Sequence, residues 1–299
     1  MRRYWFIAAP ILIVVVVAIC VALFARQKPT RVASGQPKIK VAVTIFPIAD
    51  IVKNIGRDYV DVVTLLPPGA SPHTFEPTPE SARDASGSVV LLKIGLGLDD
   101  WSQKIADAAG PMETVELSQN IALRRLDGNP DPHYWLSIAN GGLMAKTIAD
   151  TLERLDPAHA EIYRNNLILY RASLANADVR LRTKFAELQN RDFATFHEAW
   201  YYFAEQYGLN VAAAFEPSPG KEPTPQFVAS FIQTVREKHI RVIFSEPQLS
   251  SAAIAQSAKD LSVTLETLDP IGGSTPETDS YVKMVEYNGE KIFESLQNK

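Results

Sequence analysis

Apolar positions between residues 39 and 117 follow two alternating patterns, one typical of buried strands and one typical of helices. Short runs of apolar and β-branched residues predict strands. Between them lie segments with helical spacing, as in IADIVKNIG (48–56) and LDDWSQKIADAAG (98–110). The predicted strands are 39–46, 60–66, 88–95 and 112–117. This alternation predicts a mostly parallel sheet covered by helices.

The pattern changes between residues 141 and 190, where apolar residues recur at helical spacing and no strand pattern occurs. Asp156-Pro157 marks a break, because proline is favoured in the first turn of a helix. We therefore expect one helix and then a long helix of about 30 residues, which would span about 45 Å.

The strand–helix alternation returns in the C-terminal part of the chain. The predicted strands are 192–196, 210–215, 241–246 and 262–268. Together the patterns predict an α/β protein with two lobes, each built on a mostly parallel sheet, joined by a long helix. The expected lobes are residues 39–140 and 191–299, with residues 141–190 as linking helices.

The N-terminus carries the clearest compositional feature. Residues 4–25 contain no charged side chain and follow the basic start MRR, and a run of this length can span a bilayer. Residues 1–25 therefore fit either an uncleaved membrane anchor or a cleaved signal peptide, although Leu23 and Ala25 make a poor cleavage site. Residues 26–38 predict a linker. Either interpretation makes the rest of the chain extracytoplasmic, whether anchored to the membrane or periplasmic.

Composition and charge narrow the class of protein. The chain has 299 residues, enough for two domains, and its apolar content of 46% is that of a globular protein. A formal net charge of −4 without a basic patch argues against nucleic-acid binding.

The single cysteine, Cys20, lies within the apolar run directly after Ile19. Lipid attachment to Cys20 would require a small residue at the position of Ile19. The exported part therefore contains no disulfide and no thiolate metal ligand.

Four residues that can bind a metal follow four separate predicted strands. These residues are His73, His133, His197 and Asp269. Ligands of open α/β sheets bind beyond the carboxyl ends of the strands, so two candidates from each lobe would face one cleft. Three imidazoles and one carboxylate suit a divalent transition metal such as zinc. The spacing is too wide for a local zinc finger, so this site would form only in the folded protein.

Each candidate also has an ordinary interpretation. His73 could be an exposed loop residue, His133 could cap or pack, and His197 could begin a helix. Asp269 precedes a proline and could simply form a turn.

Further acids lie near the candidate ligands. Glu246 ends a predicted strand, where it could accept a hydrogen bond from a metal-bound histidine, serve as a spare ligand, or be an ordinary exposed acid. Glu76 lies close to His73 in the chain and is a second such candidate. The other two histidines, His159 and His239, occupy polar helical contexts and are expected on the solvated surface.

The motifs around these residues resemble those of the zinc- and manganese-binding solute-binding proteins of ABC importers. The matching stretches are PPGASPHTFEPTP (67–79), DPHYWLSIANGGLMAKTIADTL (131–152), FHEAWYYFAEQYGL (196–209), FEPSPGKEPTP (215–225), IFSEPQ (243–248) and LDPIGG (268–273). The resemblance extends from about residue 39 to the C-terminus. It implies two Rossmann-like α/β lobes joined by a long rigid helix, with the metal between the lobes.

The resemblance also implies the function and the ligands. The metal ligands would be His73, His133 and His197, with Asp269 as the final carboxylate. The protein would be a monomer without enzymatic activity that passes its ion to the permease and ATPase subunits of an importer, and its N-terminal helix would attach it to the membrane. Because a long helix between the lobes would resist a wide hinge motion, we expect only a small closure on binding, with local ordering of the loop around Asp269 and residues 272–280.

The chain departs from the family pattern in ways that bear on the metal. Ser137 stands where many relatives have an acid, so one acceptor near the ligands is weaker. The segment before His133 lacks the histidine-rich acidic loop of many zinc-specific relatives, and the lipid-anchor cysteine is missing. Manganese-selective relatives often have an acid in place of His197. The nitrogen retained here favours Zn²⁺, with Mn²⁺ as the alternative.

Two other functions are compatible with parts of the pattern. A surface adhesin could keep the fold and bind partners without metal. A zinc hydrolase could use three ligands, a bound water and Glu246 as a base, but the chain has no HExxH motif.

Overall fold

A computed structural model describes residues 38–126, 128–216, 223–249 and 252–297 of the chain. The predicted anchor or signal peptide (1–25) and nearly all of the predicted linker (26–38) lie outside these residues. Among the helices within the described part, none is both long enough and apolar enough to cross a membrane.

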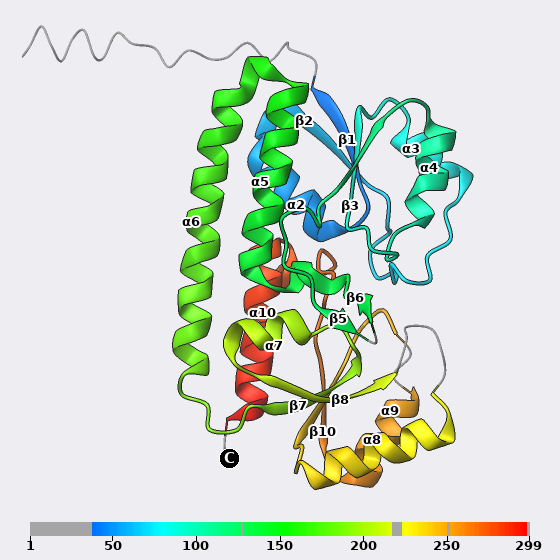
Figure 1. The fold of residues 1–299 in the computed structure, drawn as a ribbon, viewed down its shortest axis with the longest axis vertical. Helices are drawn as coiled ribbons and strands as arrows, with labels where there is room; N and C mark the ends of the chain where they lie inside the picture. Colours follow the sequence, from blue (N-terminus) through cyan, green and yellow to red (C-terminus); the bar gives the residue numbers. More distant parts are fainter. Residues whose placement is uncertain (1–37, 127, 217–222, 250–251, 298–299) are drawn as a thin grey trace, which may run out of the picture. The chain divides into compact units, whose positions relative to one another are not determined.

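The N-terminal lobe is built on a parallel sheet in the order β2-β1-β3-β4. Its strands are β1 (Ile39–Val43), β2 (Val60–Thr64), β3 (Val90–Lys93) and β4 (Glu113–Glu116). Its helices are α2 (Phe46–Gly56), α3 (Pro79–Ala85) and α4 (Trp101–Ala109). Because side chains alternate along a strand, Val41 and Val43 join the main core while Ala42 joins a smaller core on the opposite face. Helix α2 covers the first face, and α3 and α4 cover the second (Figure 1).

Two long helices, which connect the lobes along the chain, pack along each other at the left in Figure 1. They are α5 (Ile138–Leu155) and α6 (Ala160–Phe185), and the single turn η3 (Pro157–His159) connects them. The predicted break at Asp156-Pro157 is therefore confirmed. Helix α6 has 26 residues, which gives it a length of about 39 Å, slightly shorter than predicted.

The C-terminal lobe has the same architecture, with a parallel sheet in the order β10-β9-β7-β8. Its strands are β7 (Asp192–His197), β8 (Asn210–Glu216), β9 (Val242–Ser245) and β10 (Thr264–Thr267). Its helices are α7 (Tyr201–Tyr207), α8 (Pro225–Glu237), α9 (Ala252–Leu261) and α10 (Tyr281–Leu296). The predicted α/β class with two parallel sheets is confirmed.

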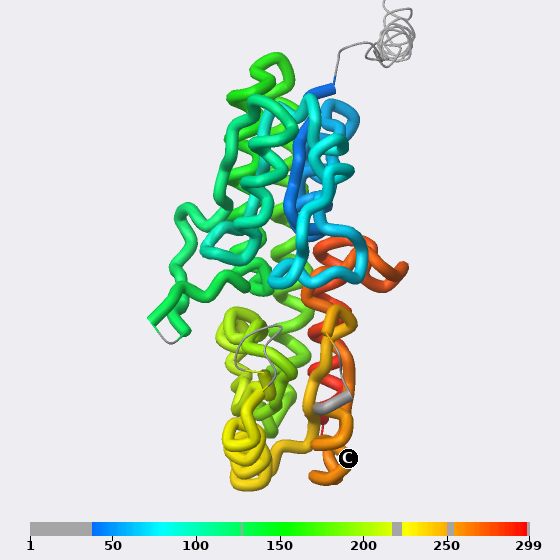
Figure 2. Tube along the Cα trace, turned by 90° about the vertical axis from the view of Figure 1, so that its right-hand side faces the viewer, coloured from blue at the N-terminus to red at the C-terminus, as the bar shows by residue number. Residues whose placement is uncertain are grey.

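The two lobes share one core. Helix α10 leaves the C-terminal lobe and packs against α6 and α2. The main core is continuous from Val43 in the first sheet, through Met144 and Leu174 in the linking helices, to Phe244 in the second sheet. Figure 2 shows the two lobes stacked along these helices. A large apolar interface opposes free movement of one lobe against the other.

Some local features were not predicted by the apolar pattern. A short antiparallel hairpin, β5 (Arg125–Leu126) and β6 (Asn129–Pro130), precedes the second candidate ligand. Strand β3 ends at Lys93 instead of residue 95, because the next two backbone N–H groups donate to the buried Asp99 carboxylate.

The expectation that His159 lies on the solvated surface is wrong. Its Nδ1 atom lies 2.6 Å from Oδ2 of Asp156, and its ring packs on Tyr59 with the centroids 4.0 Å apart. The Tyr163 hydroxyl donates to the same carboxylate oxygen. These contacts fasten the turn between α5 and α6. His239 is exposed, as expected.

Candidate metal centre

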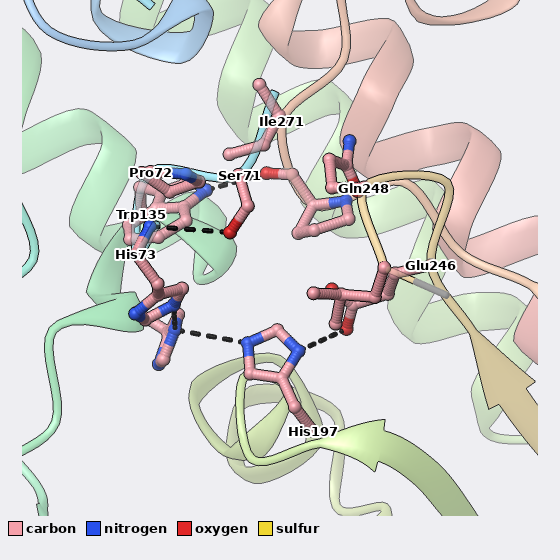
Figure 3. A pocket seen from close by; sticks show the side chains of 11 residues that line it. Ser71, Pro72, His73, Trp135, His197, Glu246, Gln248 and Ile271 are labelled. Carbon is pink, nitrogen blue, oxygen red and sulfur yellow. Dashed lines mark hydrogen bonds and ion pairs between the residues drawn. The ribbon is translucent and has the colours of Figure 1, made fainter. Parts of the chain in front are cut away.

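His73 lies in the loop that follows β2, and several contacts hold this loop. The His73 N–H donates to the Ser71 hydroxyl at 3.4 Å, and the Trp101 indole donates to the Pro72 carbonyl at 2.9 Å. Phe75 packs edge-on against Trp101. Proline restricts the backbone further, so the imidazole is presented to the cavity from a stiff loop (Figure 3).

His133 begins the turn η2 (His133–Leu136) and is oriented by a buried acid. Oδ1 of Asp131 accepts a hydrogen bond from the His133 backbone N–H at 3.0 Å and lies 2.8 Å from the ring Nδ1. The Tyr202 hydroxyl donates to the Asp131 carbonyl. A neutral imidazole that donates from Nδ1 keeps its lone pair on Nε2, so Asp131 prepares the outer nitrogen of His133 to bind a cation.

His197 is the last residue of β7, and Glu246 follows the neighbouring strand β9. Nδ1 of His197 lies 2.8 Å from Oε1 of Glu246. The Glu246 carboxylate is therefore the partner of this ring nitrogen. The Trp200 indole donates to the same oxygen at 3.0 Å. Both side chains are almost fully buried, and Nε2 of His197 is directed at the other two histidines (Figure 3).

The three imidazoles converge through their Nε2 atoms. Nε2 of His133 lies 3.0 Å from that of His73 and 3.3 Å from that of His197. One nitrogen of each ring lies within 4.8 Å of the other two. Zinc–nitrogen bonds of about 2.0–2.1 Å in a tetrahedron place the nitrogens about 3.3–3.4 Å apart. The spacing therefore fits three nitrogens around one ion.

Burial and charge set the protonation of the three rings. Burial, reinforced by the other two imidazoles, lowers the pKa of His73 to about 2. Burial and the nearby His197 hold the pKa of His133 well below its ordinary value. Burial also acts to lower the pKa of His197, but the Glu246 carboxylate and two further acids outweigh it and raise that pKa. His73 and His133 are therefore neutral and ready to bind a cation at neutral pH, whereas a cation must compete with a proton at His197 more than at the other two rings.

The cavity at the imidazoles is small. Its volume is ≈ 10 Å³, about that of one water-sized occupant. Trp135, Gln248 and Ile271 are among the residues that complete its wall (Figure 3). The space suits a single small occupant such as an ion.

The structure does not bring the Asp269 carboxylate into the group of three histidines. Oδ1 of Asp269 accepts hydrogen bonds from the Gln248 amide and from two backbone N–H groups of the following loop. Oδ2 has a long contact of 3.5 Å with the Thr278 hydroxyl. In this structure Asp269 therefore stabilises a turn through Oδ1, and its Oδ2 makes fewer contacts. The role of Asp269 as a metal ligand stays a prediction.

Two of the predicted supporting residues lie away from the imidazoles. Ser137 caps the N-terminus of α5, and its hydroxyl donates to the Gln206 side chain at 2.5 Å. Glu76 is exposed and does not line the cavity. Neither side chain therefore supports the imidazoles in this structure.

Sequence analysis missed two residues that the structure places at the site. Asp131 lies two positions before His133, and this Asp-Pro-His spacing was the available signal for a carboxylate that reaches the ring. Gln248 lies two positions after Glu246 and lines the cavity. No periodic pattern distinguishes such a glutamine from an ordinary loop residue.

Comparison with known families places the chain among proteins of metal uptake. The family model described as "Zinc-uptake complex component A periplasmic" matches residues 41–295. The manganese ABC transporter substrate-binding lipoprotein PsaA of Streptococcus mitis is 31% identical over 281 residues, which cover 88% of this chain and 91% of that protein. The metal ABC transporter substrate-binding lipoprotein FimA of Streptococcus parasanguinis is 28% identical and covers 94% and 96%.

Solved structures show the same likeness. The crystal structure of ZnuA superimposes with a TM-score of 0.80 at 30% identity, over 87% of this chain and 100% of that one. The solute-binding protein FpvC of Pseudomonas aeruginosa in complex with Mn²⁺ superimposes with a TM-score of 0.79 at 27% identity, over 87% and 98%.

Proposed function

Because this chain belongs to the family of zinc- and manganese-binding solute-binding proteins of ABC importers, we propose that it captures one divalent transition-metal ion between its lobes and delivers it to an importer. The ion is cargo and undergoes no chemical change on the protein.

The convergence of the three Nε2 atoms carries this proposal. The histidines come from a loop after β2, from the turn η2 and from the end of β7, yet their nitrogens lie within one coordination sphere. Three lone pairs aimed at one point repel each other unless a cation or protons lie between them. The neutral state of His73 and His133 leaves that place to a metal ion.

We propose that Asp269 supplies the fourth ligand through Oδ2, its less engaged oxygen. Glu246 is already paired with Nδ1 of His197 and bonded to the Trp200 indole. Its expected role is to orient His197 and to balance the charge of the ion. A modest inward movement of the loop after β10 would bring Asp269 to the imidazoles.

Zinc is the expected cargo, since three imidazoles and one carboxylate form a donor set that zinc prefers. Manganese is the alternative. It prefers more oxygen donors, and relatives of this chain are named for it.

The apolar segment in residues 1–25 is proposed to keep the protein on the outer side of the membrane, beside the permease and ATPase subunits of its importer. A monomer is sufficient for this task, because both lobes and all the proposed ligands belong to one chain.

A competition titration tests the capture site. The metal-stripped protein is titrated with zinc and with manganese against a chromophoric chelator of known affinity. We expect one ion per chain, and we expect His73→Ala and His197→Ala to lose tight binding. His239→Asn is the matched control, because His239 is exposed at φ 52°, a conformation that asparagine tolerates. Absence of stoichiometric binding by the unaltered protein at neutral pH would refute the proposal.

A further inference from the structure

Gln248 joins two loops at the edge of the metal cavity. It lies in the loop after β9, two residues beyond Glu246, and lines the same cavity as the three histidines (Figure 3). Its Nε2 donates a hydrogen bond to Oδ1 of Asp269 at 2.9 Å. The side chain therefore touches the proposed fourth ligand while it forms part of the wall of the cavity.

The contact with Asp269 decides which way the amide points. Exchanging the two amide atoms would place the Gln248 oxygen against a carboxylate oxygen at hydrogen-bond distance, where both atoms are acceptors. The nitrogen therefore faces Asp269, and Oε1 is directed elsewhere. Within the described part of the chain, the buried Oε1 has no hydrogen-bond partner.

A buried acceptor without a partner costs free energy and points to a group that is missing from its surroundings. Because Gln248 lines the cavity on which the three imidazoles converge, a captured cation is the candidate for this group. An amide oxygen is a hard donor, a type that suits manganese better than it suits zinc. Zinc in proteins usually has four ligands, whereas manganese usually has a higher coordination number.

We propose that Gln248 determines which ion the site prefers, an inference that rests on the metal capture proposed above. Its Oε1 provides an oxygen donor to the captured ion, in addition to the three imidazoles and Asp269. Manganese depends on this donor, and zinc largely does without it. The site is thereby able to hold manganese despite its zinc-like set of histidines.

Gln248→Leu tests the proposal, because leucine fills similar space and carries no donor atom. Zinc and manganese affinities of the stripped protein are measured by competition with a chelator. We expect manganese affinity to fall at least about tenfold more than zinc affinity, while retained zinc binding shows that the variant is folded. Equal losses for both ions would mean that Gln248 only supports Asp269, and would overturn the proposal.

A second variant serves as a matched control. Gln256 on α9 donates to Asp260 at 2.7 Å in the same kind of glutamine–aspartate contact, but it is exposed and lies outside the cavity. Gln256→Leu should leave the ratio of zinc to manganese affinity unchanged. A change equal to that of Gln248→Leu would also overturn the proposal.

Cobalt(II) substitution provides a readout that a purely structural role would not alter. Its visible absorption is weak at high coordination number and intense in a tetrahedral site. Gln248→Leu should shift the spectrum toward the tetrahedral type, and an identical spectrum would contradict donation by Oε1. If the unaltered protein binds neither zinc nor manganese, the proposed function fails instead, so the two failures are distinguishable.

Discussion

Replacing Glu246 by glutamine removes the negative charge beside His197 while it preserves the size of the side chain. The exposed fraction of each of these two residues is 3%, so water cannot substitute for the lost charge. Removing the carboxylate partner of a metal-bound imidazole typically costs about 10–100-fold in metal affinity, or about 1.4–2.7 kcal/mol. We expect the zinc affinity of Glu246→Gln to be lower by this factor at alkaline pH, where affinity no longer changes with pH.

The same substitution should move the pH dependence. In the unaltered protein Glu246 raises the pKa of His197 against the effect of burial, and a proton competes with the metal for this ring. Affinity is therefore complete above that pKa and falls about tenfold per pH unit below it. His73 and His133 have lowered pKa values and stay neutral in this range. Without Glu246 the pKa of His197 falls, so the plateau should extend to lower pH.

The assay is a chelator competition between about pH 5.5 and 8.5, around the ordinary pKa of histidine, with zinc and with both proteins. We expect Glu246→Gln to have a lower zinc affinity at alkaline pH than the unaltered protein. Its affinity should begin to fall only at a lower pH. An unchanged affinity at alkaline pH, together with an unchanged pH at which affinity begins to fall, would refute the role assigned to the pair of Glu246 and His197.

Three further predictions concern the framework of the site. Tyr281→Phe removes the hydroxyl that donates to the buried Trp135 carbonyl at 2.6 Å. Urea unfolding should show that the free energy of unfolding falls by about 1–3 kcal/mol, and a fall below about 0.5 kcal/mol would contradict this. Gly289→Ala places a methyl group against Leu181 where α10 meets α6, and the same assay should show overpacking of about 1–3 kcal/mol, whereas wild-type stability would show that the helices shift freely. Small-angle scattering of stripped and zinc-loaded protein should differ only slightly, because the lobes share a core; a wide domain closure would argue against movement confined to the loop after β10.

The sequence predicted most of the fold because buried strands and long amphipathic helices have distinct apolar periods. It also predicted which histidines could meet, since the carboxyl ends of parallel strands collect at one edge of a sheet. His197 illustrates this directly, as the last residue of β7. The ends of helices and strands were less predictable. Strand β3 ends early because two backbone N–H groups donate to the Asp99 carboxylate and not to a neighbouring strand.

The surroundings of the imidazoles could not be predicted in the same way. Asp131 reaches His133 through a short turn, whereas the expected acceptor Ser137 is occupied as a helix cap. His159 is drawn into a cluster with Asp156 and Tyr59 that closes a helical turn. Such contacts depend on rotamers and on residues distant in the chain, and neither is encoded in periodicity.

X-ray absorption at the zinc edge, measured on the protein loaded with one equivalent of zinc, tests the central claim most directly. The account predicts three imidazole ligands at about 2.0–2.1 Å together with oxygen, and His133→Ala should remove at least one imidazole from the spectrum. Two or fewer imidazoles in the unaltered protein, or a spectrum that His133→Ala leaves unchanged, would contradict the capture site described by the three converging histidines.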